Sequence, residues 1–112
     1  MTDLPGRPTR LNGITYKQDV ACGRLYVVIN GKPKKPYEIF VYGTGIKCSA
    51  IMEAFARTMS YTLREGYDVE ELMRQIETVR CFNAPMGDSC TRALANSLKE
   101  FMQDSQKKVD KQ

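Results

Sequence analysis

The spacing of apolar residues changes once along this chain, at about Gly45, and this change decides the fold class. Before it, three runs have the alternating or continuous apolar character of β-strands, at Ile14–Val20, Arg24–Asn30 and Tyr37–Tyr42. After it, apolar residues recur at helical spacing. Strands followed by helices predict an α+β fold, a three-stranded antiparallel β-meander with two to three helices packed on one face.

Short turns separate the predicted strands. Ala21-Cys22-Gly23 is the first, and the second begins at Asn30-Gly31 and contains Pro33 and Pro36. The middle strand holds the near-continuous apolar run Leu25-Tyr26-Val27-Val28-Ile29, which is typical of a central strand. A three-stranded sheet has two open edges, and strand pairing between copies of the chain would satisfy one of them. We therefore expect a homo-oligomer.

The helical part divides at two breaks. The first stripe ends before Gly66, a plausible C-terminal stop, and consists of Ile51, Phe55, Thr58, Met59 and Thr62. Asp68 then begins a capping box with Glu71, which predicts a short helix over residues 69–78. Asp88 or Ser89 caps a third helix, whose apolar stripe is Leu94, Leu98, Phe101 and Met102.

Length and composition indicate one domain. The 112 residues divide into an N-terminal arm (1–13), an α+β domain (14–104) and a polar tail (105–112). The net charge of +4 permits an anionic partner, and no apolar stretch reaches the roughly 20 residues of a membrane span. Without an apolar signal core at the N-terminus, we expect a cytoplasmic protein with reduced thiols and no membrane partner.

The junction between the third strand and the first helix is a candidate anion-binding cradle. Glycine turns let backbone N–H groups approach an anion, and a helix start adds a positive dipole end. The candidate ligand-binding residues here are Gly43, Thr44, Gly45, Lys47 and Ser49. The spacing is not that of a P-loop, and the structural alternative is a glycine-rich turn beside a helix cap.

A second loop leads into the third helix. Ser89 and Thr91 can donate hydrogen bonds, and Arg92 can pair with an anion, so these three residues are also candidate ligand-binding residues. The alternative is an ordinary capped helix start. The lysines of the second turn, Lys32, Lys34 and Lys35, are interpreted as a solvated hairpin tip that could contact nucleic acid phosphates.

Four cysteines lie where the chain changes direction, and the sequence has no histidine. Thiols at element ends can converge on one metal ion, so Cys22, Cys48, Cys81 and Cys90 are candidate zinc ligands. No Cys-x-x-Cys pair is present, and the alternative is that the thiols pack as small apolar groups. Without histidine, Ser-His-Asp and Cys-His catalysis are excluded. An enzyme that acts through a lysine or a cysteine thiolate stays open as a third hypothesis, and we expect no enzymatic activity.

The order of several motifs resembles the TSCPD domain family. They are Gly13-Ile14-Thr15-Tyr16-Lys17, Cys22-Gly23-Arg24-Leu25-Tyr26-Val27, Pro36-Tyr37-Glu38-Ile39-Phe40-Val41, the Gly45–Ala50 turn, Arg80-Cys81 and Ser89-Cys90. Domains of this family occur at the C-terminus of adenosylcobalamin-dependent ribonucleotide reductases and as small stand-alone proteins. The resemblance implies zinc binding through the four cysteines. The chain departs from the family's Thr-Ser-Cys-Pro-Asp motif, because the same place reads Asp88-Ser89-Cys90-Thr91-Arg92.

Two functions follow as hypotheses. The first is a non-catalytic, homo-oligomeric binding protein for a small phosphorylated ligand, in particular a nucleotide. Its sharper form is a protein of the kind that viruses use to sequester nucleotide immune signals. The second is a zinc-stabilised accessory module that docks on a ribonucleotide reductase or on nucleic acid.

Overall fold

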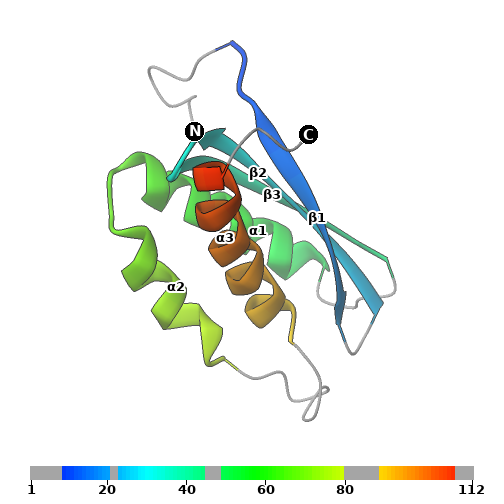
Figure 1. Cartoon of the computed structure of the whole chain (residues 1–112). Helices are drawn as coiled ribbons and strands as arrows, with labels where there is room; N and C mark the ends of the chain where they lie inside the picture. The colour runs from blue at the N-terminus through cyan, green and yellow to red at the C-terminus, as the bar shows by residue number, and fades with distance from the viewer. Residues whose placement is uncertain (1–8, 21–22, 45–48, 80–88, 108–112) are drawn as a thin grey trace.

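The computed structural model describes residues 9–20, 23–44, 49–79 and 89–107. Within them, three strands precede three helices (Figure 1). The elements are β1 (Gly13–Val20), β2 (Gly23–Lys32), β3 (Lys35–Thr44), α1 (Ser49–Arg64), α2 (Val69–Glu77) and α3 (Cys90–Lys107). The strands form one antiparallel sheet in the order β1-β2-β3. The predicted α+β fold with a three-stranded meander is therefore confirmed.

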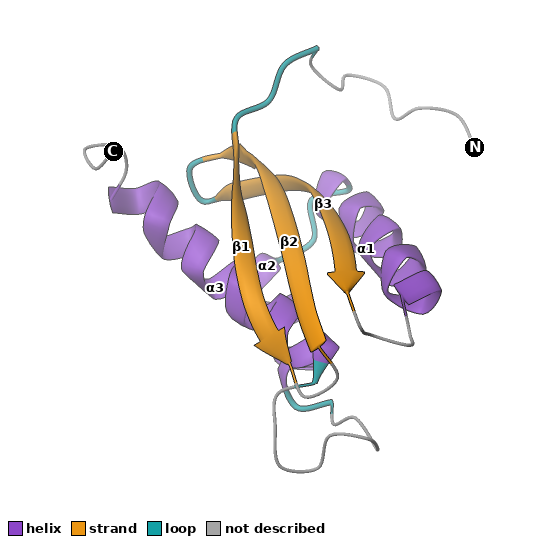
Figure 2. Ribbon diagram, turned by 90° about the vertical axis from the view of Figure 1, so that its right-hand side faces the viewer, coloured by secondary structure: helices purple, strands orange, loops and turns teal. Residues whose placement is uncertain are grey.

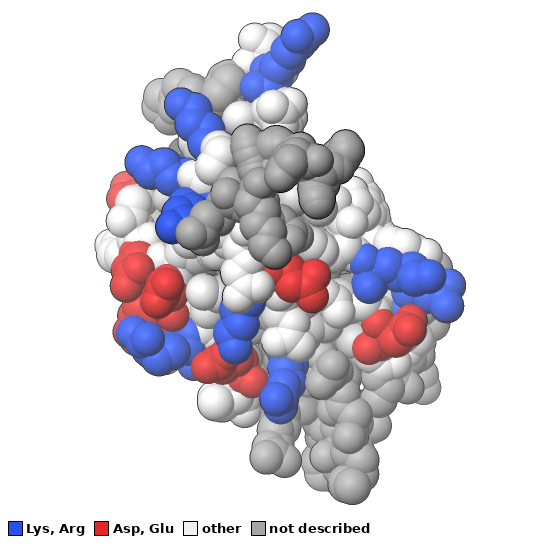
Figure 3. All heavy atoms as spheres, in the orientation of Figure 1, with Lys and Arg blue, Asp and Glu red and all other residues white. Residues whose placement is uncertain are grey.

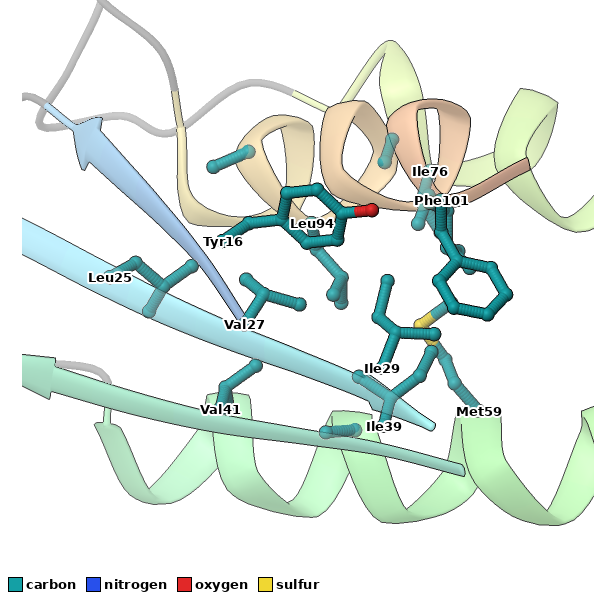
Figure 4. Close-up of a cluster of buried hydrophobic side chains, with 14 of the residues drawn as sticks. Tyr16, Leu25, Val27, Ile29, Ile39, Val41, Met59, Ile76, Leu94 and Phe101 are labelled. Carbon is teal, nitrogen blue, oxygen red and sulfur yellow. The ribbon is translucent and has the colours of Figure 1, made fainter. Parts of the chain in front are cut away.

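Helix α3 lies between the sheet and α2 (Figure 1). Its predicted stripe is buried at Leu94, Leu98 and Phe101, and the small residues Ala93 and Ala95 are buried as well. A helix that is buried on more than one side needs small residues where its neighbours approach closely. Figure 4 shows the side chains of α3 meeting those of all three strands in the main hydrophobic core.

The contact between α3 and β1 includes one polar link. Ser97 is fully buried, and its hydroxyl donates a hydrogen bond to the carbonyl oxygen of Ala93 at 3.0 Å. The Ser97 hydroxyl oxygen in turn accepts a hydrogen bond from Nε2 of Gln18 at 2.9 Å. Buried polar groups need such partners because an unsatisfied one would keep its full desolvation cost. The link fixes the position of α3 along β1.

Helix α1 lies beside β3 and covers part of that edge of the sheet (Figure 2). The Ser60 hydroxyl accepts a hydrogen bond from the Ile39 N–H at 2.8 Å and makes a 3.2 Å contact with the Ile39 carbonyl oxygen. It also contacts the Ala56 carbonyl oxygen at 3.0 Å. One side chain thus satisfies backbone groups that a fourth strand would otherwise bind.

The buried face of α1 differs from the predicted stripe. Ile51 is 70% exposed and Thr58 is exposed, whereas Met59 is buried as expected. The side chains that face the core are Met52, Ala56, Met59 and Leu63, together with Ser60. The prediction placed the face by helical spacing, and of its other members Phe55 also packs against the core. Two small residues on this face, Ala56 and Ser60, allow the close approach to β3 that the Ser60 hydrogen bonds require.

Replacing Ser60 by alanine should destabilise the fold. The Ser60→Ala variant leaves the N–H and carbonyl of Ile39 buried without the hydroxyl, at a cost of about 1–3 kcal/mol in the free energy of unfolding. Urea denaturation would measure the change. The matched control is Thr58→Ala on the exposed side of α1, whose hydroxyl binds only the Ala54 carbonyl, and it should change stability by less than about 0.5 kcal/mol. Equal effects of the two variants would contradict the proposed role of Ser60.

Candidate anion-binding pocket

A pocket of about 580 Å³ lies between the β2–β3 turn and the junction of α1 with α2. This volume is within the usual range for small-molecule sites. The turn contributes its lysines, and the junction contributes the end of α1 and the start of α2. The lining residues are Leu11, Gly31, Lys32, Lys34, Lys35, Pro36, Tyr37, Leu63, Arg64, Gly66, Tyr67, Asp68 and Val69.

The turn that forms one wall has an unusual backbone. Lys32 pairs with Lys35, so Pro33 and Lys34 form a two-residue loop. Lys34 has φ +62°, a left-handed conformation that costs a non-glycine residue about 1–2 kcal/mol. The strand register shifts at Asn30/Gly31, where a Cβ on Gly31 would come within 2.4 Å of the Lys35 carbonyl oxygen. The irregular hairpin therefore needs glycine at position 31 and holds three lysines at one wall.

The opposite wall begins where α1 ends. Gly66 has φ +91° and donates its N–H to the Leu63 carbonyl at 3.0 Å, and Tyr67 donates to the Thr62 carbonyl at 3.4 Å. These two bonds form a Schellman motif, so Gly66 is the predicted helix stop. The sharp change of direction places Tyr67, which is 68% exposed, on the pocket wall.

Arg64 joins the two walls. Its Nη2 atom binds Oε1 of Glu38 at 3.1 Å, and its guanidinium carbon lies 4.9 Å from the centroid of the Tyr37 ring. The Glu38 side chain is only 2% exposed, and its Oε2 accepts a hydrogen bond from Nδ2 of Asn30 at 2.8 Å. Because a buried carboxylate needs both charge compensation and hydrogen bonds, these contacts fix Arg64 beside the hairpin.

The lining is predominantly positive. Lys32, Lys34, Lys35 and Arg64 carry four cationic groups, and Figure 3 shows basic side chains gathered over this end of the molecule. Asp68 contributes one carboxylate, which caps α2 by accepting the Glu70 N–H at 3.3 Å. Such a lining favours an anionic ligand.

The cap of α2 differs from the predicted capping box. Asp68 is the N-cap, as expected. The carboxylate of Glu71, however, binds Arg74 at 2.8 Å and Gln75 at 2.8 Å on its own helix. Cationic and amide donors one turn along the helix hold Glu71 away from the Asp68 backbone, because charge-assisted bonds are the stronger ones.

The predicted glycine cradle lies at the other end of β3. Gly43 and Thr44 are the last residues of this strand, and Ser49 is the first residue of α1. Gly45 and Lys47 lie outside the described residues. Ten residues of β3 separate the two regions, a distance of roughly 30 Å along an extended strand. The cradle and the basic pocket are therefore separate, and the role of the cradle stays a prediction.

The Ser89 hydroxyl is engaged within the protein. It accepts the Arg92 N–H at 3.0 Å, contacts the Val79 carbonyl oxygen at 3.0 Å and lies 3.1 Å from the Thr91 hydroxyl. Ser89 is also buried. These bonds are those of an N-cap that holds the start of α3 close to the end of α2. Ligand binding by Ser89 and Thr91 stays a prediction, and the capping alternative agrees with the geometry.

Arg92 lines a smaller recess of about 400 Å³ between α2 and α3. The other lining residues are Glu77, Thr78, Asn96 and Lys99. Lys99 Nζ binds Glu77 Oε1 at 2.6 Å. This hydrogen bond is the main reason why the pKa of Glu77 lies below its usual value, and the charges of Lys99 and Arg92 lower it further. Because a carboxylate compensates the cations here, this recess is a weaker anion site than the hairpin pocket.

Of the four predicted zinc ligands, only Cys90 lies in the part of the chain that the structure describes. It packs half-buried against the hydrophobic core and forms no disulfide bond there. Cys22, Cys48 and Cys81 lie outside the described residues. The described part of the chain contains no group of three or more cysteine, aspartate or glutamate residues that could hold a metal. A zinc site that includes Cys90 would therefore need ligands from outside the described residues, and zinc binding by the four cysteines stays a prediction.

Sequence comparison places the chain in a family. The family model of the TSCPD domain matches residues 2–102, nearly the whole chain. The chain belongs to the TSCPD domain family. This domain is associated with ribonucleotide reductases. No curated protein and no solved structure matches the chain.

The helices of this TSCPD domain can be compared with the expectation that the chain has no membrane span. Among the residues that the structure describes, none of the helices has the length and apolar character needed to cross a bilayer.

The pair between Lys99 and Glu77 should be visible in a pH titration. Its stabilisation is present above the pKa that Glu77 has in the unfolded chain, and it is lost as the pH falls through the lowered pKa of the folded state. In Lys99→Ala, we expect the pKa of Glu77 to rise toward its usual value, measured by NMR of the side-chain carboxyl carbon. The internal control is Glu71, whose pKa is lowered by Arg74 and should not move. An unchanged Glu77 titration would contradict the pairing.

Proposed function

We propose that this TSCPD protein is a non-catalytic binding protein for a small phosphorylated ligand, in particular a nucleotide, which it holds in the hairpin pocket. The observation that carries the proposal is the lining of this pocket, in which four cationic groups and two tyrosines surround about 580 Å³. A mononucleotide combines the two chemistries that such a lining accepts, a multiply charged phosphate and a flat aromatic base.

The cations divide into two kinds. Lys32, Lys34 and Lys35 are exposed and carry flexible ammonium groups, which act as point charges for phosphate oxygens. Arg64 is held by the Tyr37 ring and by the buried Glu38 carboxylate, which compensates its charge, so it offers N–H donors at a fixed position without an ordering cost on binding. Mobile lysines around a fixed arginine suit a ligand with more than one phosphate oxygen to bind.

Tyr67 supplies an exposed aromatic face for a base. Stacking of a base on an aromatic ring contributes about 1–3 kcal/mol, and every base has a face that can stack. Asp68, next to Tyr67 in the lining, caps α2 through Oδ1, and its second carboxylate oxygen can accept a hydrogen bond from a sugar hydroxyl. Phosphate, base and sugar would thus each find a chemical partner in the same pocket.

Two features support binding without turnover. The sequence has no histidine, which removes the commonest general acid and base. The carboxylate of the pocket, Asp68, is engaged in capping α2. Binding without turnover would suit a protein that sequesters a nucleotide signal.

Isothermal titration calorimetry against nucleotides, cyclic nucleotides and inorganic phosphate tests the proposal. We expect at least one nucleotide to bind more tightly than phosphate alone. Lys35→Ala and Tyr67→Ala should each weaken the affinity for this nucleotide by about tenfold or more. The first removes a charge-assisted hydrogen bond of about 1.5–3 kcal/mol, and the second removes base stacking of about 1–3 kcal/mol. Arg64 is unsuitable for this test, because its removal would leave the buried Glu38 charge unpaired and cost about 3–5 kcal/mol of stability.

One control variant and one variant of the alternative site show where the nucleotide binds. Lys17→Ala removes a lysine from the sheet, far from the pocket lining, and should leave the affinity unchanged. Lys47→Ala tests the glycine cradle predicted from the sequence. Loss of binding in Lys47→Ala with full affinity in Lys35→Ala would overturn the assignment to the hairpin pocket. Absence of binding to every nucleotide would overturn the proposed function.

Family membership favours a second candidate function. The protein would be a zinc-stabilised accessory module that docks on a ribonucleotide reductase or on nucleic acid. When bound, zinc would crosslink the cysteine-bearing loops. Elemental analysis of the purified protein tests this candidate. It predicts one zinc ion per chain, lost in Cys90→Ser together with thermal stability, whereas Ser97→Ala would keep the metal. A metal-free protein with unchanged stability in Cys90→Ser would contradict it.

A further inference from the structure

One face of the sheet is open over most of its area, and among the described helices only α1 reaches it, where Arg64 binds Glu38. Figure 2 looks onto this face, with α2 and α3 behind the sheet and α1 beside β3. The register places Val28 opposite Phe40 and Tyr26 opposite Tyr42 in two adjacent rows. Phe40 is 44% exposed and Tyr42 is 61% exposed. These four side chains, here called the open-face cluster, form an apolar patch at the centre of the sheet.

The cluster explains a feature of the central strand. Residues 25–29 are all apolar, a pattern typical of a strand that is covered on both faces. In the structure Leu25, Val27 and Ile29 are buried by the helices, whereas Tyr26 and Val28 point to the open face. A strand with one solvated face normally alternates with polar residues. The sequence of β2 is therefore that of a strand whose second face also has a partner.

The charges around the cluster are mixed. Arg24 Nε binds Asp19 Oδ1 at 3.3 Å on one side, and Arg57 Nη2 binds Glu53 Oε2 at 2.9 Å on the other. Lys17 lies opposite Tyr26 on the same face. A nucleic acid or an anionic membrane surface requires a clear excess of cations. Around the cluster, two of the three cations, Arg24 and Arg57, are already paired with acidic residues. These surroundings therefore favour a partner that carries both positive and negative charges.

A second copy of this chain is such a partner. We infer that the open-face cluster is the centre of a two-fold symmetric contact between two copies, packed sheet against sheet. An isologous contact sets the same patch against itself, so aromatic residues meet at the centre and cations of one copy can face acids of the other. Aromatic cores with polar rims are typical of protein interfaces, and sheets pack face to face about 10 Å apart.

The groove between β3 and α1 widens this surface. It has a volume of about 150 Å³, and its lining includes Phe40, Tyr42, Glu53 and Arg57. An aromatic side chain of the second copy can enter the groove beside the apolar ring of Phe40. The contact thus extends from the sheet onto the exposed side of α1. This arrangement differs from pairing of edge strands, because the β3 edge is bound by Ser60 at Ile39.

Sedimentation velocity of the purified full chain over a wide concentration range tests the inference. We expect a dimer that dissociates on dilution. Phe40→Glu and Tyr42→Glu place a carboxylate in the centre of the contact and should each raise the dissociation constant by at least about tenfold. Both residues are partly exposed, so the fold should persist, which circular dichroism would verify.

The matched control is Tyr67→Glu, the same chemical change at a residue of 68% exposure at the hairpin pocket. This variant should dimerise as the wild type does. A wild type that stays monomeric at every concentration would overturn the inference, as would a dimer that survives both open-face substitutions. Binding of a single-stranded oligonucleotide that is lost in Tyr42→Glu would assign the surface to nucleic acid and overturn it too. Nucleotide affinity in Tyr42→Glu, measured separately, distinguishes failure of this inference from failure of the proposed pocket.

Discussion

The contact between Ser60 and Ile39 is the constraint on which the arrangement of this TSCPD domain depends. One hydroxyl bonds to the N–H and carbonyl of an edge-strand residue, so α1 lies against the edge of β3 rather than across a face of the sheet. This position leaves room for α3 as the helix that covers the core face. It also brings the last turn of α1 next to the β2–β3 hairpin, where Arg64 reaches Glu38. The pocket and the open sheet face are two consequences of the same placement.

The Glu38–Arg64 pair shows how a costly group can be used to define a site. A carboxylate that is 2% exposed loses most of its hydration, and its attraction to a guanidinium offsets that loss only with good geometry and further hydrogen bonds. Asn30 supplies one of these bonds from the neighbouring strand. Replacing the whole pair by apolar residues would serve stability as well or better. The pair is therefore better explained by what it positions, a fixed cation between a hairpin and a helix end.

The fold was predictable because it follows from local periodicity, whereas the pocket was not. Alternation in β1 and β3 and the helical stripe of α3 each lie within a dozen or so residues, and they predicted the correct elements. The pocket joins Lys35 to Tyr67, which only the packing of α1 on β3 brings together. The orientation of α1 was missed for the same reason, since Ser60 gives no apolar signal. The cluster of Lys32, Lys34 and Lys35 beside a glycine was the one available sign, and it was interpreted as a solvated tip.

The motif that names the family has a different meaning in this chain from the one its chemistry first suggests. Ser89 has the hydroxyl of an anion ligand at a helix start, but that hydroxyl caps α3 and contacts the Val79 carbonyl oxygen at 3.0 Å. A hydroxyl that already binds the Arg92 N–H at the helix start and a neighbouring carbonyl gains little by turning to a ligand, because both protein partners would lose their bonds. The serine thus closes the gap between α2 and α3, and Arg92 one turn later faces a recess that contains Glu77. Exposed lysines without such compensation lie at the hairpin, which is why the proposed phosphate site is placed there rather than at the motif.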